Sequence, residues 1–198
     1  MKLKLNLPNV LVLTRIFIAM IVIILLMVQA VNNEIMVILL WITLVLFLAA
    51  VITDFVDGNY ARKHNQITAF GKLFDPLADK ILINSVMIFF TVFGWIPIWV
   101  TVLFIVRDIM VDGLRMNLAA NGEVMPAGLY GKLKTLFQML GIALLFIFGM
   151  YVIDDIGVFP FDWDYWYTLI PLVIGLAFSV SSGIIYYYKA MKGSKNEG

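Results

Sequence analysis

Cysteine is absent from this chain, histidine occurs once, and charged residues are few. Without cysteine there can be no disulfide and no thiolate metal site, and the lone His64 cannot build a zinc site by itself. Charged residues make up 14% of the 198 residues, whereas an ordinary soluble domain has about 25%. An ordinary soluble domain is therefore excluded.

Hydrophobic residues, by contrast, account for 63% of the chain, and the mean hydropathy is +0.98. Uncharged runs recur at close to the length of about 20 residues that a helix needs to cross a bilayer. The length suits one domain. We predict an all-α membrane protein in which residues 1–198 form a single transmembrane domain with six spans, at about 10–30, 35–53, 76–93, 97–118, 134–153 and 165–188.

A turn signal divides the uncharged run from Ile81 to Val106, since Gly94 and Pro97 lie in its middle. Neither half is long enough to cross a bilayer alone. The third helix is therefore expected to begin near Asp75 or Pro76, and the fourth to continue past the charged residues that follow Val106. Four tryptophans near the predicted span ends suggest anchors at the membrane interface: Trp95, Trp99, Trp163 and Trp166.

Basic residues are distributed unevenly along the chain. All 14 lysines and arginines fall in the head, in residues 54–80, in residues 107–134, in the tail, or at Arg15. The three opposite loops contain Glu34 and aspartates instead. The positive-inside rule then predicts a multi-pass protein of a bacterial-type cytoplasmic membrane, with both termini and the 54–80 segment facing the cytoplasm.

Four aspartates recur at set intervals between residues 54 and 80: Asp54, Asp57, Asp75 and Asp79. Offsets of three and four would place the members of each pair on one helix face. Carboxylates gathered near a membrane repel one another and need cations to remain together. Mg²⁺ or Mn²⁺ suits them, because hard divalent ions prefer oxygen ligands and often bridge to a substrate phosphate.

This segment resembles the signature of the CDP-alcohol phosphatidyltransferases, DGxxAR framed by aspartates. The matching positions are Asp54, Asp57, Gly58, Ala61, Arg62, Gly71, Asp75 and Asp79. The resemblance implies that family's fold of six transmembrane helices, a catalytic site on the cytoplasmic side, and a homodimer. It also implies a lipid-linked cytidine diphosphate as donor and no nucleic-acid partner.

The resemblance further implies a role for each position. Asp54, Asp57 and Asp75 would hold a pair of Mg²⁺ or Mn²⁺ ions, while Asp79 would lie near the second ion and act as the general base on the incoming alcohol. The donor CDP-diacylglycerol would be contacted by Gly58, Ala61, Arg62, Thr68 and Gly71. For Arg62 a simpler interpretation, an anchor at the membrane surface, remains open.

Basic residues on the fourth and fifth helices are candidates for binding the acceptor: Arg107, Arg115, Lys132 and Lys134. Positive-inside topology alone would explain them. Together with Pro8, Asn9, Arg15, Gly131, Thr135 and Gln138, however, they look like the phosphatidylglycerophosphate synthase branch of the family. A basic cluster suits an acceptor that has its own phosphate, such as glycerol 3-phosphate. The chain departs from the branch at Asp108, where glutamate is frequent, and at Val12, where threonine is frequent. Asp112 is an additional acid three residues before Arg115, and two consequences stay open: it pairs with that arginine and orients it, or it weakens the positive potential of the pocket.

Three other interpretations stay open from the sequence. The same chemistry could use another alcohol, namely inositol phosphate, serine or phosphatidylglycerol. A magnesium-dependent membrane prenyltransferase also uses aspartate pairs, but usually in separate repeats of a longer chain. A divalent-cation carrier would need polar residues in the middle of several spans, and the outer halves here have almost none.

Overall fold

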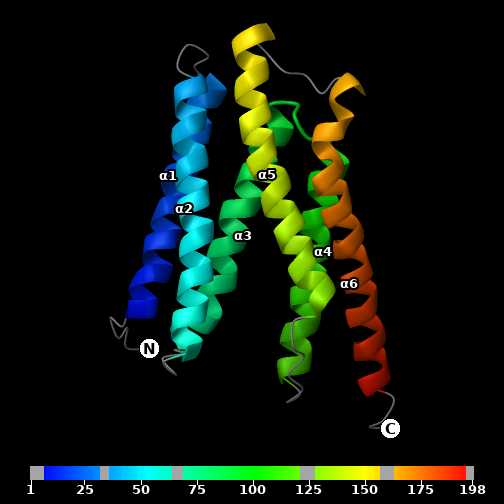
Figure 1. Cartoon of the computed structure of the whole chain (residues 1–198). Coiled ribbons are helices and arrows are strands. Elements are labelled where there is room, and N and C mark those ends of the chain that lie inside the picture. The colour runs from blue at the N-terminus through cyan, green and yellow to red at the C-terminus, as the bar shows by residue number, and fades with distance from the viewer. Residues whose placement is uncertain (1–6, 32–35, 64–68, 121–127, 157–162, 195–198) are drawn as a thin grey trace. The chain divides into compact units, whose positions relative to one another are not determined.

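The computed structural model describes residues 7–31, 36–63, 69–120, 128–156 and 163–194 (Figure 1). These residues form six α-helices and one short 3-10 helix, and no strand occurs among them. The helices are α1 (Leu7–Val31), α2 (Met36–Lys63), α3 (Ala69–Val92), α4 (Ile98–Ala120), α5 (Leu129–Ile156), η1 (Trp163–Leu169) and α6 (Ile170–Ser194). The prediction of an all-α protein with six helices is confirmed.

The helices belong to two compact units. Unit 1 comprises Met1–Phe93 and Phe146–Phe159, and unit 2 comprises Gly94–Leu145 and Pro160–Gly198, so the boundary between the units falls within α5. Helix α1 packs against both α2 and α3 in unit 1, and α4 packs against α6 in unit 2. Each unit therefore has a helix-on-helix core of its own.

The core of unit 1 is built from aliphatic and aromatic side chains. The ring of Phe146 lies edge-on to that of Phe90, with centroids 4.7 Å apart, and 6.1 Å from that of Phe47. One buried polar pair joins α1 to α2, where the Gln29 amide donates to the Thr43 hydroxyl at 3.0 Å. Such a bond satisfies polar groups that would otherwise be costly to bury between apolar helices.

In unit 2, glycine allows close approach between α5 and α6. A methyl group placed on Gly141 would come within 2.7 Å of Leu172 Cγ and 3.2 Å of the Leu172 backbone nitrogen. The rings of Phe137 and Phe178 stack beside this contact, with centroids 5.6 Å apart. Small residues are typical of tightly packed membrane helices.

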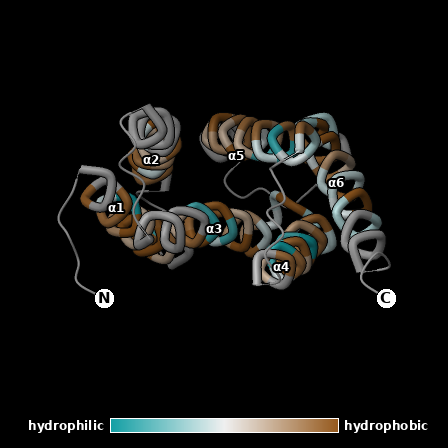
Figure 2. The backbone as a smooth tube through the Cα atoms, turned by 90° about the horizontal axis from the view of Figure 1, so that it is seen from below, coloured by the Kyte–Doolittle hydropathy of each residue, from teal (hydrophilic) through white to brown (hydrophobic). Residues whose placement is uncertain are grey.

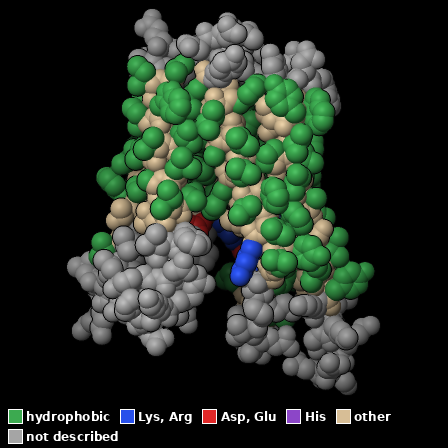
Figure 3. Space-filling view, viewed as in Figure 1, with side chains coloured by type: hydrophobic (Ala, Val, Ile, Leu, Met, Phe, Trp, Pro, Cys, Tyr) green, Lys and Arg blue, Asp and Glu red, His purple; other side chains and the backbone are tan. Residues whose placement is uncertain are grey.

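The surface of the described residues is strongly apolar. In Figure 3 hydrophobic side chains cover most of the described part of one face, and Figure 2 shows brown, hydrophobic stretches on all six helices, with teal bands on α3, α4 and α5. Within the described chain, three helices contain stretches long and apolar enough to cross a bilayer: Val12–Gln29, Leu129–Met150 and Trp166–Tyr188. The chain is a membrane protein.

Helices α2 and α3 extend further into the aspartate segment than the predicted spans did. Helix α2 continues ten residues beyond Thr53, to Lys63, and α3 begins at Ala69, ahead of the expected start near Asp75. The spans were defined by uncharged residues, but a helix does not end where charge begins. Pro76 lies inside α3, where it supplies no backbone N–H donor.

The predicted turn between the third and fourth helices is confirmed. Gly94 has a φ of 77°, a left-handed conformation that glycine adopts without steric cost, and α4 begins directly after Pro97. The interface role predicted for Trp95 is wrong, because this residue is only 1% exposed. Trp99 and Trp166 are exposed as expected, and the side chain of Trp163 lies outside the described residues.

Candidate functional site

The aspartate segment lies on the ends of α2 and α3. Asp54 and Asp57 lie in α2, and Asp75 and Asp79 lie in α3, so both arms are helical as the residue offsets required. In unit 1 both helices pack against α1. The side chains of Asp54, Asp57, Gly58, Ala61, Arg62, Gly71 and Asp75 lie outside the described residues, as does the whole of Thr68.

Asp79 is the one predicted metal ligand whose side chain is described. Its Oδ1 accepts a hydrogen bond from Arg15 Nη1 at 3.3 Å, which is also an ion pair. The Asp79 side chain is 30% exposed, whereas that of Arg15 is 1% exposed. A buried guanidinium on α1 therefore neutralises and orients a carboxylate that retains access to a ligand.

Sequence reasoning did not include Arg15 among the site residues. Two signals pointed to it, namely a charge at the start of an otherwise apolar span and its place in the resemblance. A cation within a membrane helix is costly unless it is paired, and Asp79 forms an ion pair with Arg15. Carboxylates are the donor type that hard divalent ions prefer, so the aspartate segment fits Mg²⁺ or Mn²⁺ chemically.

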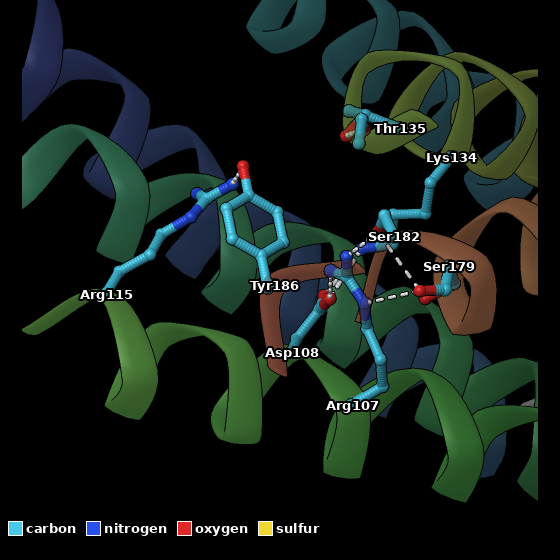
Figure 4. A network of polar contacts seen from close by, with 9 residues as sticks. Arg107, Asp108, Arg115, Lys134, Thr135, Ser179, Ser182 and Tyr186 are labelled. Atoms are coloured by element: carbon cyan, nitrogen blue, oxygen red, sulfur yellow. Dashed lines mark hydrogen bonds and ion pairs between the residues drawn. The ribbon is translucent and has the colours of Figure 1, made fainter. Parts of the chain in front are cut away.

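A second polar cluster lies in unit 2, and we call it the basic cluster: Arg107, Asp108, Lys134, Ser179 and Ser182 (Figure 4). Lys134 Nζ donates to both Asp108 carboxylate oxygens, at 2.8 and 2.6 Å. Arg107 Nη1 donates to Asp108 Oδ1 at 2.9 Å. The Asp108 and Lys134 side chains are both 8% exposed, so one carboxylate holds two cations in place in a poorly solvated setting.

Helix α6 supplies the remaining partners of Arg107. Arg107 Nε donates to the Ser179 backbone carbonyl at 2.8 Å, and Nη2 donates to the Ser182 hydroxyl. Lys134 also lies over the face of Phe104, with its Nζ 5.6 Å from the ring centroid. Residues of α4, α5 and α6 thus form one hydrogen-bonded network around Arg107 and Asp108, as Figure 4 shows.

Arg115 is held by a different residue of α6. Its Nη2 donates to the Tyr186 hydroxyl at 2.7 Å, and its Cζ lies 4.7 Å from the centre of the Tyr186 ring. The same hydroxyl accepts a hydrogen bond from the Gly128 backbone nitrogen at 3.2 Å. Tyr186 lies four residues, about one helical turn, after Ser182 on α6, so Arg115 is held next to the basic cluster.

The structure separates the four basic residues that the sequence grouped. Arg107 and Lys134 meet through Asp108, and Arg115 is bonded to Tyr186, one turn of α6 from Ser182. Lys132 is exposed on α5. Sequence reasoning missed Ser179, Ser182 and Tyr186, although their offsets of three and four place them on one face of α6, and polar residues in an apolar span are a usable signal.

Comparisons with known proteins agree on one family. The family model described as CDP-alcohol phosphatidyltransferase matches residues 5–180. A Bacillus subtilis (strain 168) protein, named CDP-diacylglycerol--glycerol-3-phosphate 3-phosphatidyltransferase, is 38% identical over 151 residues, which cover 76% of this chain and 74% of the relative.

Two further relatives have the same or a similar name. A Rickettsia prowazekii (strain Madrid E) protein with the same name is 36% identical over 161 residues, covering 79% of this chain and 86% of the relative. A Mycobacterium tuberculosis (strain CDC 1551 / Oshkosh) protein, named probable phosphatidylglycerophosphate synthase, is 34% identical over 147 residues, covering 74% of this chain and 65% of the relative.

Proposed function

The chain belongs to the CDP-alcohol phosphatidyltransferase family, and on that premise we propose that it transfers the phosphatidyl group of CDP-diacylglycerol to sn-glycerol 3-phosphate. The products are phosphatidylglycerol phosphate and CMP. A glycerol hydroxyl oxygen attacks the phosphorus on the lipid side of the diphosphate, and the bond from that phosphorus to the CMP oxygen breaks. The hydroxyl proton passes to a base.

Asp79 is the base in this proposal. A carboxylate within hydrogen-bond reach of an alcohol removes its proton as the new bond forms. The 3.3 Å contact with Arg15 supports the role, because a buried guanidinium holds the Asp79 side chain in one orientation while leaving it 30% exposed. Orientation of a catalytic group lowers the entropy that must be lost at the transition state.

Asp54, Asp57, Asp75 and Asp79 are the residues that would hold a pair of Mg²⁺ or Mn²⁺ ions. Such ions, when bound, neutralise the charge of the diphosphate. We propose that Gly58, Ala61, Arg62, Thr68 and Gly71 contact the cytidine diphosphate of the donor. Arg62 would contribute a cation beside the diphosphate, and the glycines would allow close approach of the backbone.

The observation that carries the choice of acceptor is the charge around Asp108. Arg107 and Lys134 both bond to the Asp108 carboxylate, and Arg115 is bonded to Tyr186 one helical turn from Ser182, so the three cations outnumber this one carboxylate. A phosphate monoester has a charge of about −1.5 to −2 at neutral pH and would match this excess. A neutral alcohol or serine would leave the positive charge beyond that of Asp108 without a matching anion.

The location of these groups follows from charge distribution. We propose a bacterial cytoplasmic membrane with both termini, the aspartate segment and the basic cluster on the cytoplasmic side, because lysine and arginine are confined to those segments.

The family resemblance also supports a homodimer. Mass measurement in lipid nanodiscs would distinguish one chain from two.

An acceptor panel tests the proposed function directly. Purified protein in nanodiscs would receive CDP-diacylglycerol labelled in its cytidine, and CMP release would be measured with glycerol 3-phosphate, glycerol, serine, inositol phosphate or phosphatidylglycerol. We expect release to require glycerol 3-phosphate and a divalent ion, and to stop when the ion is chelated. Equal release with serine or phosphatidylglycerol would refute the acceptor assignment.

A further inference from the structure

Arg107 contacts α6 with both its aliphatic part and its guanidinium. A methyl group on Gly183 would lie in ordinary van der Waals contact with Arg107, 3.7 Å from its Cγ, so the aliphatic part of the arginine passes over the helix at this glycine. At the tip, Nε and Nη2 both bond to α6, through the Ser179 carbonyl and the Ser182 hydroxyl. Nη1 bonds to Asp108. Three of the five guanidinium N–H groups are thereby engaged in these bonds.

The Ser182 hydroxyl is itself fixed in direction. It is 2% exposed, and it donates its proton to the Ser179 backbone carbonyl at 3.1 Å. Its oxygen lone pairs therefore remain available to accept from Arg107 Nη2. A hydroxyl that donates on one side and accepts on the other sets the plane of the guanidinium.

We propose that Ser182 is a positioning residue that orients the Arg107 guanidinium so that its remaining N–H groups face the phosphate of the acceptor. The inference rests on the proposed function, since it assumes that the acceptor has a phosphate. Arginine loses considerable rotamer freedom when it is ordered, and a site that orders it during folding binds its ligand more tightly. Ser182 supplies that order from a helix that the sequence signature does not include.

A positioning role for Ser182 and a packing role predict different effects of its substitution on stability and substrate binding. A residue that only fills space would affect stability and both substrates alike when it is replaced. A residue that aims Arg107 should affect the binding of the phosphate-containing acceptor and leave the lipid donor unaffected. Bidentate recognition of phosphate by arginine depends on the plane of the guanidinium, so even a small rotation is costly.

Steady-state kinetics of Ser182→Ala, with both substrates varied, test the proposal. We expect the KM for glycerol 3-phosphate to rise about tenfold, the size expected for a charge-assisted hydrogen bond, while kcat and the KM for CDP-diacylglycerol change less than about twofold. Ser182→Thr keeps the hydroxyl and should restore most of the acceptor affinity. An unchanged KM for glycerol 3-phosphate in Ser182→Ala overturns the proposal.

Ser181→Ala is the matched control. Ser181 is the adjacent residue of α6, is exposed, and donates to the Ala177 carbonyl of its own helix at 2.8 Å, so its loss should leave all constants unchanged. If Ser182→Ala cannot be purified, Ser182→Cys preserves the volume with a much weaker acceptor and must show the same selective rise.

Two outcomes separate failure of this inference from failure of the proposed function. A wild-type protein that does not use glycerol 3-phosphate fails the acceptor panel before any variant is made, and both ideas fall together. A wild-type protein that does use it, combined with a Ser182→Ala variant whose KM values for both substrates rise in parallel and whose melting temperature falls, shows a purely structural Ser182. That result overturns the inference alone.

Discussion

At the scale of single residues, the contact between Arg15 and Asp79 joins two parts of the chain that the sequence signature treats separately. The two residues are 64 positions apart, and only one of them lies in the aspartate segment. The guanidinium is only 1% exposed and pairs with a carboxylate of another helix, so the pair joins α1 to α3 as well as orienting a carboxylate. The first helix is therefore part of the site.

Replacing Arg15 with Gln should reduce both turnover and stability. The variant removes the charge that faces Asp79 Oδ1, so the carboxylate loses its fixed orientation, and we expect kcat to fall about ten- to a hundredfold. The loss of a charge-assisted bond should lower the free energy of unfolding by about 1–3 kcal/mol. CMP release and thermal unfolding in the same detergent measure the two effects.

Thr14→Ala is the control for this experiment. Thr14 is exposed next to Arg15, and its hydroxyl donates to the Val10 carbonyl of the same helix at 2.9 Å. Arg15→Lys keeps the charge without the planar fork, so its turnover should fall between wild type and Arg15→Gln. If Arg15→Gln turns over as fast as Thr14→Ala, the ion pair has no part in the reaction.

Substitutions of the basic residues that the sequence predicted as one acceptor site should differ in their effect on the KM for glycerol 3-phosphate. Lys134 is buried and bonded to Asp108, whereas Lys132 is exposed two residues away on the same helix. We expect Lys134→Gln to raise the KM for glycerol 3-phosphate at least about tenfold, because the substitution removes a positive charge from the proposed phosphate site. A hydrogen bond made by a charged group contributes about 1.5–3 kcal/mol. Lys132→Gln should change it less than about twofold. Similar effects of the two substitutions would contradict this division.

At the scale of helices, α6 is held to its neighbours by small residues as well as by polar bonds. Gly141 of α5 lies so close to Leu172 that an added methyl group would meet both the leucine side chain and its backbone nitrogen. A rotamer change can relieve only the first of these contacts. The helices would have to move apart, and the residues that α6 supplies to the basic cluster would move with it.

Gly141→Ala should therefore destabilise the protein. Overpacking of this kind costs about 1–3 kcal/mol, and the measured melting temperature should fall accordingly. Gly131→Ala is the matched control on the same helix, because, apart from its chain neighbours and the helix's own backbone, no atom of the described residues lies within 4 Å of the position where its methyl group would be. Alanine is also the better helix former, so that variant should be neutral or slightly more stable. Equal melting temperatures for the two variants would contradict the packing argument.

Much of the helical architecture could be predicted from sequence, because uncharged runs and the turn at Gly94 are local signals. Helix ends were less predictable. Composition marks where the apolar core of a span stops, but α2 continues as a helix to Lys63, through charged residues. Trp95 was misassigned for a related reason, since its neighbours suggested an interface while the turn buries it.

The partners within the site were the least predictable part. The signature identified Asp79, and the basic residues suggested an acceptor that has a phosphate. Contacts such as Arg107 with Ser182 span 75 residues, and no local pattern encodes which serine of α6 an arginine of α4 will meet. Composition also could not show that Lys132 is exposed while Lys134 is buried, because the two residues are only two positions apart in the sequence of the same helix.

At the scale of the whole molecule, the absence of cysteine makes the proposed orientation directly testable. Every thiol in a single-cysteine variant is the one introduced, so labelling reports one position. Asn33→Cys lies beside Glu34, in a connection without basic residues, and Asn196→Cys lies in the lysine-containing tail. The positive-inside rule assigns these two positions to opposite sides of the membrane.

Spheroplasts, whose outer membrane has been removed and whose cytoplasmic membrane is intact, should therefore label differently at the two positions. A membrane-impermeant maleimide should react with Asn33→Cys from outside and should reach Asn196→Cys only after the membrane is permeabilised. The distinction matters for function, because glycerol 3-phosphate is charged and reaches the basic cluster only from the compartment that contains it. Labelling of Asn196→Cys before permeabilisation would place the tail outside. The proposal that the acceptor enters from the cytoplasm would then fail as well.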